Sequence, residues 1–341
     1  MPNILPSIHF DKEDKTYVPG DIVTGLVRFD LPQPLSARSI MIGSSGKTET
    51  WNITTFEPNC KKRIFNGVET VWVSEDGKNQ LIGSHEFPFS FALPSECPPT
   101  FKGLYGQNKY KVTVFVDTPW KMTTRKVKEE FTVNTFLDLP EKMFPNPDKM
   151  TSWFYRSVLQ AGLVFKEGPV TLKVSMPSLV YKGGDTVVLD FNVINKSAVP
   201  IKNICAKLCE RTHFHARNQH TPCKEFTFHT CPLGYFGQEY TCRKIGSVCT
   251  KRVDIPPYST QSVTLAVVIP ETVKTPSFES GLITHGYLFE LGVQAQGSWF
   301  AQYMTAKIYI GDKKGDEDED EPKVTMKEML LQNAPPPAYT P

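Results

Sequence analysis

The amino-acid sequence repeats itself, and the repeat limits what the chain can fold into. Residues 17–23 read YVPGDIV and residues 181–187 read YKGGDTV, an offset of 164 residues. An alternating segment that starts at Tyr110 is matched by one that starts at Tyr287, an offset of 177 residues. Matches that keep their order along a chain indicate two tandem copies of one fold. The larger second offset places additional residues in the middle of the second copy.

The repeated segments have the two-residue period of β-strands. In the first copy Val23, Val27 and Phe29 fall on one face of a strand, and polar residues fall on the other. The equivalent apolar positions of the second copy are Val187, Phe191 and Val193. The 28 prolines and 22 glycines favour many turns and short strands. Strands with one apolar face are typical of antiparallel sheets in a sandwich, so we predict an all-β protein of two tandem antiparallel β-sandwiches.

Composition excludes several classes of protein. Hydrophobic residues make up 40% of the 341 residues, which is enough for two domains that each bury a core. A net charge of +2, with scattered basic residues, argues against nucleic-acid binding. No apolar run approaches the roughly 18 residues of a membrane span, and the first residues lack the pattern of a signal peptide. We therefore expect a cytoplasmic protein with reduced thiols.

Changes in composition divide the chain into four parts. We expect an N-terminal domain in residues 1–138, a linker in 139–168, a second domain in 169–312 and a tail in 313–341. Residues 316–321 of the tail are six consecutive acids, and such blocks repel one another and stay disordered. Residues 332–341 are rich in proline, which favours an extended conformation.

A family resemblance is carried most clearly by the first copy. Residues 17–25 (YVPGDIVTG) resemble the opening of arrestin-like domains. Residues 87–94 (FPFSFALP), 98–101 and 119–121 look like the second half of the N-terminal domain of α-arrestins, and residues 170–195 are similar to the start of their C-terminal domain. The resemblance implies two arrestin-like, immunoglobulin-like β-sandwiches joined by a hinge.

The resemblance also implies a role as a trafficking adaptor. Such a protein holds membrane receptors or transporters as cargo and recruits a WW-domain ubiquitin ligase of the HECT type for ubiquitination, endocytosis and sorting. It is cytoplasmic, is recruited to the plasma membrane and endosomes, and associates with membranes peripherally through its partners. We expect no enzymatic activity, because the sequence has no Gly-x-Ser-x-Gly elbow, phosphate loop or dinucleotide fingerprint.

One motif in the tail fits the recruitment of a ligase. Pro336, Pro337 and Tyr339 form a Pro-Pro-x-Tyr motif two residues from the end of the chain. A WW domain binds a polyproline II segment because proline is already fixed near that conformation. Family members often carry two such motifs, and paired motifs gain effective concentration for tandem WW domains. Pro256-Pro257-Tyr258 lacks the spacer residue, and we predict that it lies in a turn.

Cysteine and histidine concentrate in the second copy. Six of the eight cysteines and four of the seven histidines lie between residues 205 and 249. Thiolates and imidazoles suit zinc, although the spacings lack the pairs of a zinc knuckle. The alternating positions of Cys205 and Cys209 also suit ordinary buried thiols. The candidate ligands of a structural zinc are Cys205, Cys209, His213, His215, Cys223 and Cys231.

Two alternatives to the ligase adaptor stay open. The first is a metal- or redox-responsive regulator that uses residues 205–249. The second is a sorting-coat subunit similar to the arrestin-like subunit of retromer, which would not use the Pro-Pro-x-Tyr motif. The basic run Lys61-Lys62-Arg63 could contact phosphate groups, but we interpret it as part of a solvated loop.

Overall fold

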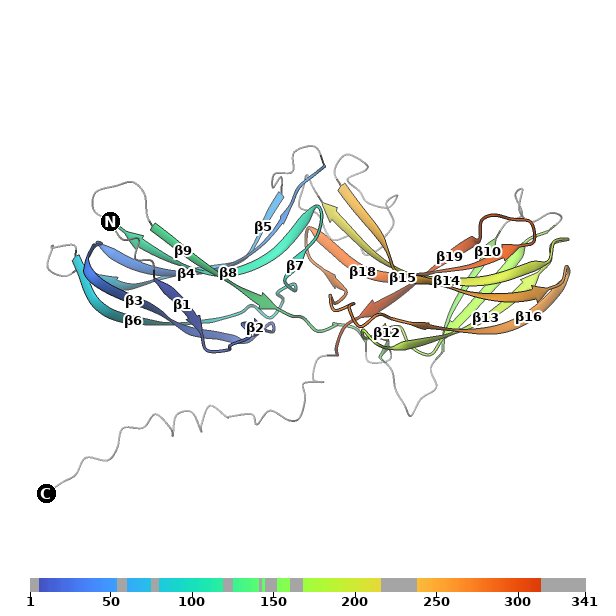
Figure 1. The fold of residues 1–341 in the computed structure, drawn as a ribbon, viewed down its shortest axis with the longest axis horizontal. Coiled ribbons are helices and arrows are strands. Elements are labelled where there is room, and N and C mark those ends of the chain that lie inside the picture. The colour runs from blue at the N-terminus through green and yellow to red at the C-terminus, as the bar shows by residue number, and fades with distance from the viewer. Residues whose placement is uncertain are drawn as a thin grey trace, which may run out of the picture.

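The protein folds into two β-sandwiches that lie end to end (Figure 1). This computed structural model describes residues 6–53, 60–74, 80–118, 125–140, 143–144, 152–159, 168–215 and 238–313. In each sandwich a small sheet packs against a six-stranded sheet. The predicted all-β class and the tandem arrangement are confirmed.

The first sandwich is built from the strands of the first copy. Its small sheet has the order β1-β3-β6, with bounds β1 (Ser7–Phe10), β3 (Ile22–Ser36) and β6 (Gln80–Ala92). Its six-stranded sheet has the order β2-β9-β8-β4-β5, and β7 pairs with β8. The bounds are β2 (Thr16–Tyr17), β4 (Ser39–Thr50), β5 (Cys60–Val73), β7 (Phe101–Lys102), β8 (Gly106–Asp117) and β9 (Arg125–Val133). The short β2 pairs in parallel with β9, whereas the long strands pair antiparallel.

The second sandwich repeats this topology and adds one edge strand, β10. Its small sheet has the order β10-β11-β13-β16, and its six-stranded sheet has the order β12-β19-β18-β14-β15 with β17 on β18. The small sheet comprises β10 (Trp153–Leu159), β11 (Val170–Met176), β13 (Thr186–Asn195) and β16 (Ser259–Val268). The large sheet comprises β12 (Val180–Tyr181), β14 (Ile201–His215), β15 (Gln238–Ile255), β17 (Phe278–Glu279), β18 (Ile283–Ala295) and β19 (Gln302–Ile310). Thus β1 corresponds to β11, β2 to β12, and so on to β9 and β19.

The apolar residues that alternate along the repeated strands form the two hydrophobic cores. Val23, Val27 and Phe29 are buried in the first core, as predicted. The equivalent residues Val187, Phe191 and Val193 are buried in the second core. Full burial of such a side chain contributes roughly 1.5–3 kcal/mol, so the repeated pattern supplies each sandwich with its own hydrophobic stabilisation.

The repeated Gly-Asp pair forms the same turn in both sandwiches. Gly20 and Gly184 both have a φ of 95°, a conformation that favours glycine. The next residue accepts a backbone N–H bond with its carboxylate: Asp21 from Val18 at 3.0 Å, and Asp185 from Lys182 at 2.7 Å. This turn explains why the motif recurs, since it links the short parallel strand to the first long strand of each copy.

Part of the predicted linker belongs to the second sandwich. Within residues 139–168, β10 pairs antiparallel with β11 and forms an edge of the small sheet. Trp153 and Tyr155 pack against the second core, and the Tyr155 hydroxyl donates to the backbone oxygen of Lys307 at 2.7 Å. These two aromatic residues therefore pack against the second domain, whereas Phe154 between them is 76% exposed.

The two sandwiches meet through a shared group of buried side chains. We call it the junction cluster, and its members are Cys60, Phe101, Tyr105, Phe214, Phe278, Leu282 and Ile283. The ring of Phe214 fits over Gly103 and Gly106, where a Cβ atom would lie 2.8 Å from it. The backbone N–H of Leu137 also donates to the oxygen of Asp312 at 2.9 Å, so the end of the second domain contacts the chain between the domains.

Candidate functional site

The predicted WW-binding residues Pro336, Pro337 and Tyr339 lie outside the described residues, and so do the zinc candidates Cys223 and Cys231. The described candidates all lie on β14, at Cys205, Cys209, His213 and His215. Ile204, Ala206 and Leu208 contribute to the second core, so the alternating candidates occupy the opposite face of the strand.

The structure separates the four β14 candidates. The rings of His213 and His215 contact each other with centroids 4.8 Å apart, and the backbone oxygen of His215 accepts a hydrogen bond from Thr50 of the first sandwich. Cys209 lies with Cys242 and Glu290 instead, and the possible ligand atoms of these three residues lie within 4.8 Å of one another. Among the described residues, this is the group of three that could hold a metal ion.

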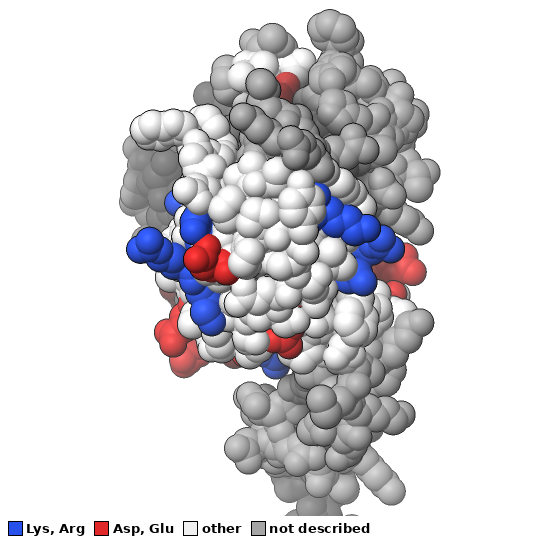
Figure 2. Space-filling model, turned by 90° about the vertical axis from the view of Figure 1, so that its right-hand side faces the viewer, with Lys and Arg blue, Asp and Glu red and all other residues white. Residues whose placement is uncertain are grey.

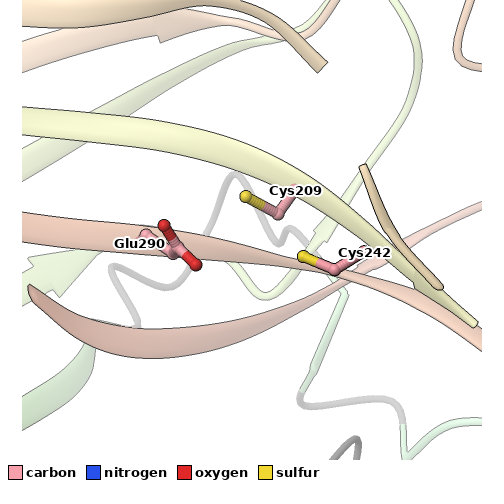
Figure 3. A group of neighbouring side chains, drawn as sticks. All are labelled: Cys209, Cys242 and Glu290. Carbon is pink, nitrogen blue, oxygen red and sulfur yellow. The ribbon is translucent and has the colours of Figure 1, made fainter. Parts of the chain in front are cut away.

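Strand register brings this thiol and carboxylate group together. Figure 3 shows the side chains converging from β14, β15 and β18. Cys209 pairs with Lys244 while Arg211 pairs with Cys242, so the two cysteines are diagonal neighbours. Cys209 is buried and Cys242 is exposed, which leaves one side of the group open to solvent.

Two cations surround the same group. The Nζ atom of Lys207 lies 3.0 Å from Oε2 of Glu290, and Nη2 of Arg211 lies 3.3 Å from Oε1. Arg211 also lies directly opposite Cys242 in the register of β14 and β15. Burial, with smaller effects of Glu290 and Cys242, raises the pKa of the Cys209 thiol to about 11. The Cys209 thiol is therefore protonated at neutral pH unless something replaces its proton.

A buried histidine lies beside the junction cluster. His285 hydrogen-bonds through Nδ1 with the Thr212 hydroxyl at 2.8 Å and through Nε2 with the Tyr287 hydroxyl at 3.2 Å. Its ring centroid lies 5.0 Å from that of Phe101 in the first sandwich. Burial, with a smaller effect of the Arg243 charge, lowers the pKa of His285 to about 3. The side chain is therefore a neutral hydrogen-bonding group and a poor metal or proton-transfer candidate at neutral pH.

The outward face of the first six-stranded sheet is basic. Lys109, Lys47 and Arg63 lie directly opposite one another across β8, β4 and β5. Lys111 lies beside them, directly opposite Glu130 of β9. Burial together with the charges of Lys128, Lys47 and Lys109 lowers the pKa of Lys111, and Glu130 offsets part of this effect. We call Lys47, Arg63, Lys109, Lys111 and Lys128 the basic face. Like charges opposite one another destabilise a sheet, so this arrangement favours an acidic partner.

The basic run predicted in a loop lies in a strand. Lys61, Lys62 and Arg63 belong to β5, and this corrects the loop interpretation. The pattern Lys-Lys-Arg gives no alternation of polarity, and for that reason the sequence did not indicate a strand here. The buried Glu49 lies two residues from Lys47 on β4, and it contacts Lys47 at 2.5 Å and Lys109 at 3.6 Å. Its charge offsets part of the repulsion.

A groove with a volume of about 1120 Å³ lies between the two sandwiches. Its lining includes the turn at Asp21, residues 95–99, residues 135–139 and, from the second sandwich, residues 277–279 and Lys307. Because both domains contribute, its shape depends on how the junction cluster holds them.

The distal end of the second sandwich exposes aromatic side chains. Figure 2 shows this end, where uncharged surface occupies the middle and basic side chains lie to both sides. Trp299 and Phe300, in the connection between β18 and β19, are 91% and 78% exposed, and Tyr258, after β15, is 65% exposed. Pairing of Ile201 with both Ile255 and Ala295 places these two connections at the same end. Exposed apolar surface of this kind is typical of interaction sites when it is contiguous.

Comparison with known proteins identifies the family to which this pair of sandwiches belongs. Residues 6–140 match the family described as arrestin (or S-antigen), N-terminal domain, and residues 166–314 match arrestin (or S-antigen), C-terminal domain. The order of the two matches agrees with the order of the two sandwiches. The fold is therefore a tandem pair of arrestin domains.

The curated relatives that the chain matches include arrestin domain-containing proteins. The chain is 28% identical to arrestin domain-containing protein 1 of Homo sapiens over 218 residues, which cover 59% of this chain and 45% of that protein. It is 27% identical to arrestin domain-containing protein 4 of Homo sapiens over 209 residues, covering 55% and 47%. It is 23% identical to arrestin domain-containing protein 17 of Caenorhabditis elegans over 208 residues, covering 56% and 48%. Each match spans less than half of the relative's length.

The chain belongs to the α-arrestin family of arrestin-domain-containing proteins. This confirms the resemblance carried by the sequence motifs. Members are in general non-enzymatic trafficking adaptors that act through contacts with other proteins. No helix in the described part of the chain is long and apolar enough to cross a bilayer.

Proposed function

We propose that this α-arrestin links membrane-protein cargo to a WW-domain ubiquitin ligase of the HECT type. The observation that carries the proposal is the Pro-Pro-x-Tyr motif of Pro336, Pro337 and Tyr339, which follows the second arrestin domain in the sequence. In this role the protein is cytoplasmic and is recruited to the plasma membrane and endosomes through its partners. It promotes ubiquitination, endocytosis and sorting of the cargo without chemistry of its own.

The position of the motif supports this function. The second arrestin match ends at residue 314, and the motif lies at residues 336–339 behind the acidic block. In the proposed complex, Pro336 and Pro337 stack in the aromatic groove of a WW domain and Tyr339 enters a neighbouring pocket. Proline loses little conformational entropy on binding, because its φ angle is already restricted.

The basic face supports a cargo-binding role for the first sandwich. Its opposed cations Lys109, Lys47 and Arg63 gain most from a partner that brings negative charge. The matching cargo element is an acidic or phosphorylated segment of a receptor or transporter. The alternative of a retromer-like coat subunit assigns no role to Tyr339, so the motif distinguishes the two functions.

Titration of the full chain with an isolated WW domain of a HECT ligase tests the proposal. We expect Tyr339→Ala, and a chain truncated after Gln332, to abolish measurable binding while both sandwiches keep their thermal stability. Pro257→Ala alters the other proline-tyrosine segment, which forms the turn between β15 and β16, and is the matched control expected to bind normally. Equal binding by the intact and truncated chains would remove the ligase-adaptor function.

A further inference from the structure

The geometry points to a zinc-binding site formed by the sulfur atoms of Cys209 and Cys242 and the carboxylate of Glu290. These residues come from three neighbouring strands, β14, β15 and β18, and their ligand atoms lie within 4.8 Å of one another (Figure 3). The site differs from the set that the sequence suggested, because Cys209 is the one member that it keeps. It uses Cys242 and Glu290 in place of Cys205, His213, His215, Cys223 and Cys231. It is independent of the ligase motif and of the basic face.

The distances suit a tetrahedral ion after a small adjustment. Zinc binds thiolate sulfur at about 2.3 Å and carboxylate oxygen at roughly 2.0–2.2 Å, so two sulfurs on one ion lie about 3.8 Å apart. The present separation of up to 4.8 Å thus needs to contract by about 1 Å. Rotation of the exposed Cys242 side chain can supply this change, because Cys242 is not held in the core. The same exposure leaves a fourth position that water can occupy.

The ligand types favour a borderline or soft divalent ion. Two thiolates and one carboxylate match zinc, whereas calcium and magnesium require oxygen ligands alone. Binding replaces the thiol proton of Cys209, and metal affinity at such sites falls as the pH falls.

The cations around the group are compatible with a bound ion. A carboxylate has about four lone-pair sites, so Glu290 can accept from Lys207 and Arg211 and still bind zinc through a remaining lone pair. Hydrogen bonds of this kind orient metal-binding carboxylates in proteins. The two positive charges also offset the negative charge of two thiolates and a carboxylate. A simple ion-pair network accounts for the proximity of Glu290, Lys207 and Arg211. It does not account for the two cysteine sulfurs beside them.

A disulfide fits the same pair less well. Cys209 and Cys242 are diagonal neighbours in the register of β14 and β15. Diagonal Cβ atoms lie roughly 7 Å apart in antiparallel sheets, whereas a disulfide needs Cβ atoms about 3.5–4.5 Å apart. An ion bridges the wider spacing without moving either strand.

Competition for Zn²⁺ between the full-length, chelator-treated protein and a chromophoric chelator tests the site. We expect one equivalent to bind, with release of protons. Cys209→Ser and Cys242→Ser should each weaken binding by more than the about 10- to 100-fold that loss of an outer-shell partner costs. Glu290→Gln removes the negative charge of this ligand but keeps an amide oxygen, so it should weaken binding by at least about tenfold. Cys205→Ser and Cys249→Ser, in the same two strands, are matched controls that should bind as the unaltered protein does.

Two further measurements keep the test decisive. Circular dichroism of Cys242→Ser checks folding, and this exposed position is expected to tolerate the change. Cobalt(II) should give a thiolate-to-metal absorption band that Cys209→Ser and Cys242→Ser each reduce and that Cys205→Ser leaves intact. The inference is overturned if the unaltered protein binds no zinc, if the control variants lose zinc as fully as the ligand variants, or if thiol titration of the freshly purified protein shows these two cysteines joined in a disulfide.

Discussion

The hydroxyl of Thr50 in the first sandwich donates a hydrogen bond to the backbone oxygen of His215 in the second. Next to this bond, the Phe214 ring is fully buried and lies 5.9 Å from the Tyr105 ring and 6.4 Å from the Phe101 ring, centroid to centroid. The end of β14 therefore joins the two domains through both a polar and an apolar contact. This joint fixes the groove between them and the relative direction of the basic face and the distal aromatic end.

Removal of the Phe214 ring should uncouple the two sandwiches. Replacement of a buried Phe by Ala costs about 3–5 kcal/mol, and here the loss falls on the contact between domains. We expect Phe214→Ala to split a single calorimetric unfolding transition into two and to increase the radius of gyration in small-angle scattering. Phe191→Ala is the control within one core, and it should lower the stability of the second sandwich without separating the domains. A single transition and an unchanged radius for Phe214→Ala would contradict the joint.

His285 should make the protein less stable as the pH falls below about 6.5. Its pKa in the folded protein is about 3, against an ordinary value of about 6.5. The unfolded chain therefore takes up a proton between these values that the folded protein does not. The free energy of unfolding should fall by up to about 1.4 kcal/mol per pH unit in this window from this group alone, and it should level off below pH 3.

His285→Gln separates this effect from other titrations, because Gln keeps hydrogen-bonding groups but does not titrate. Denaturant unfolding at pH 7, 6 and 5 should show a shallower loss of stability in the variant. Between pH 7 and pH 5 the unaltered protein should lose about 2 kcal/mol more than the variant. His9→Gln is the surface control and should keep the slope of the unaltered protein. Equal slopes for His285→Gln and the unaltered protein would mean that His285 is already protonated or not buried.

Charge reversal on the basic face should weaken cargo recognition. Arg63→Glu and Lys111→Glu each replace attraction with repulsion, so binding of an acidic or phosphorylated cargo peptide should fall at least about tenfold and depend less on salt. Lys196→Glu, in the turn between β13 and β14, makes the same change of charge in the other domain and should bind normally. Fluorescence anisotropy at two salt concentrations measures both effects. If Lys196→Glu and Lys111→Glu weaken binding equally, net charge rather than this face governs recognition.

The alternation of apolar and polar residues along the sequence predicted most of the strands and both cores. Val23, Phe29, Val187 and Phe191 repeat with a period of two, and the Gly-Asp turn needs its own residue types, so strands and cores follow from neighbours in the sequence. The edge strand β10 lies among prolines in a segment without a counterpart in the first copy, and its pairing with β11 depends on a distant strand.

The candidate sites depend on register, which the sequence does not state. Cys209 lies beside Cys242 because of the way β14 pairs with β15, and Glu290 joins them through the pairing of β14 with β18. In the same way Lys109, Lys47 and Arg63 form a row only once three strands are aligned. The sequence showed that cysteines gather between residues 205 and 249, but it offered no signal that selects one partner among them.

The ligase motif can be tested in cells by proximity labelling. The full chain, fused to a labelling enzyme, is compared with its Tyr339→Ala form at equal expression. A WW domain needs the tyrosine as well as the prolines, so the variant should lose labelling of HECT-type ligases while labelling of membrane cargo persists. Undiminished ligase labelling by Tyr339→Ala would contradict the proposed role of this α-arrestin as a ligase adaptor.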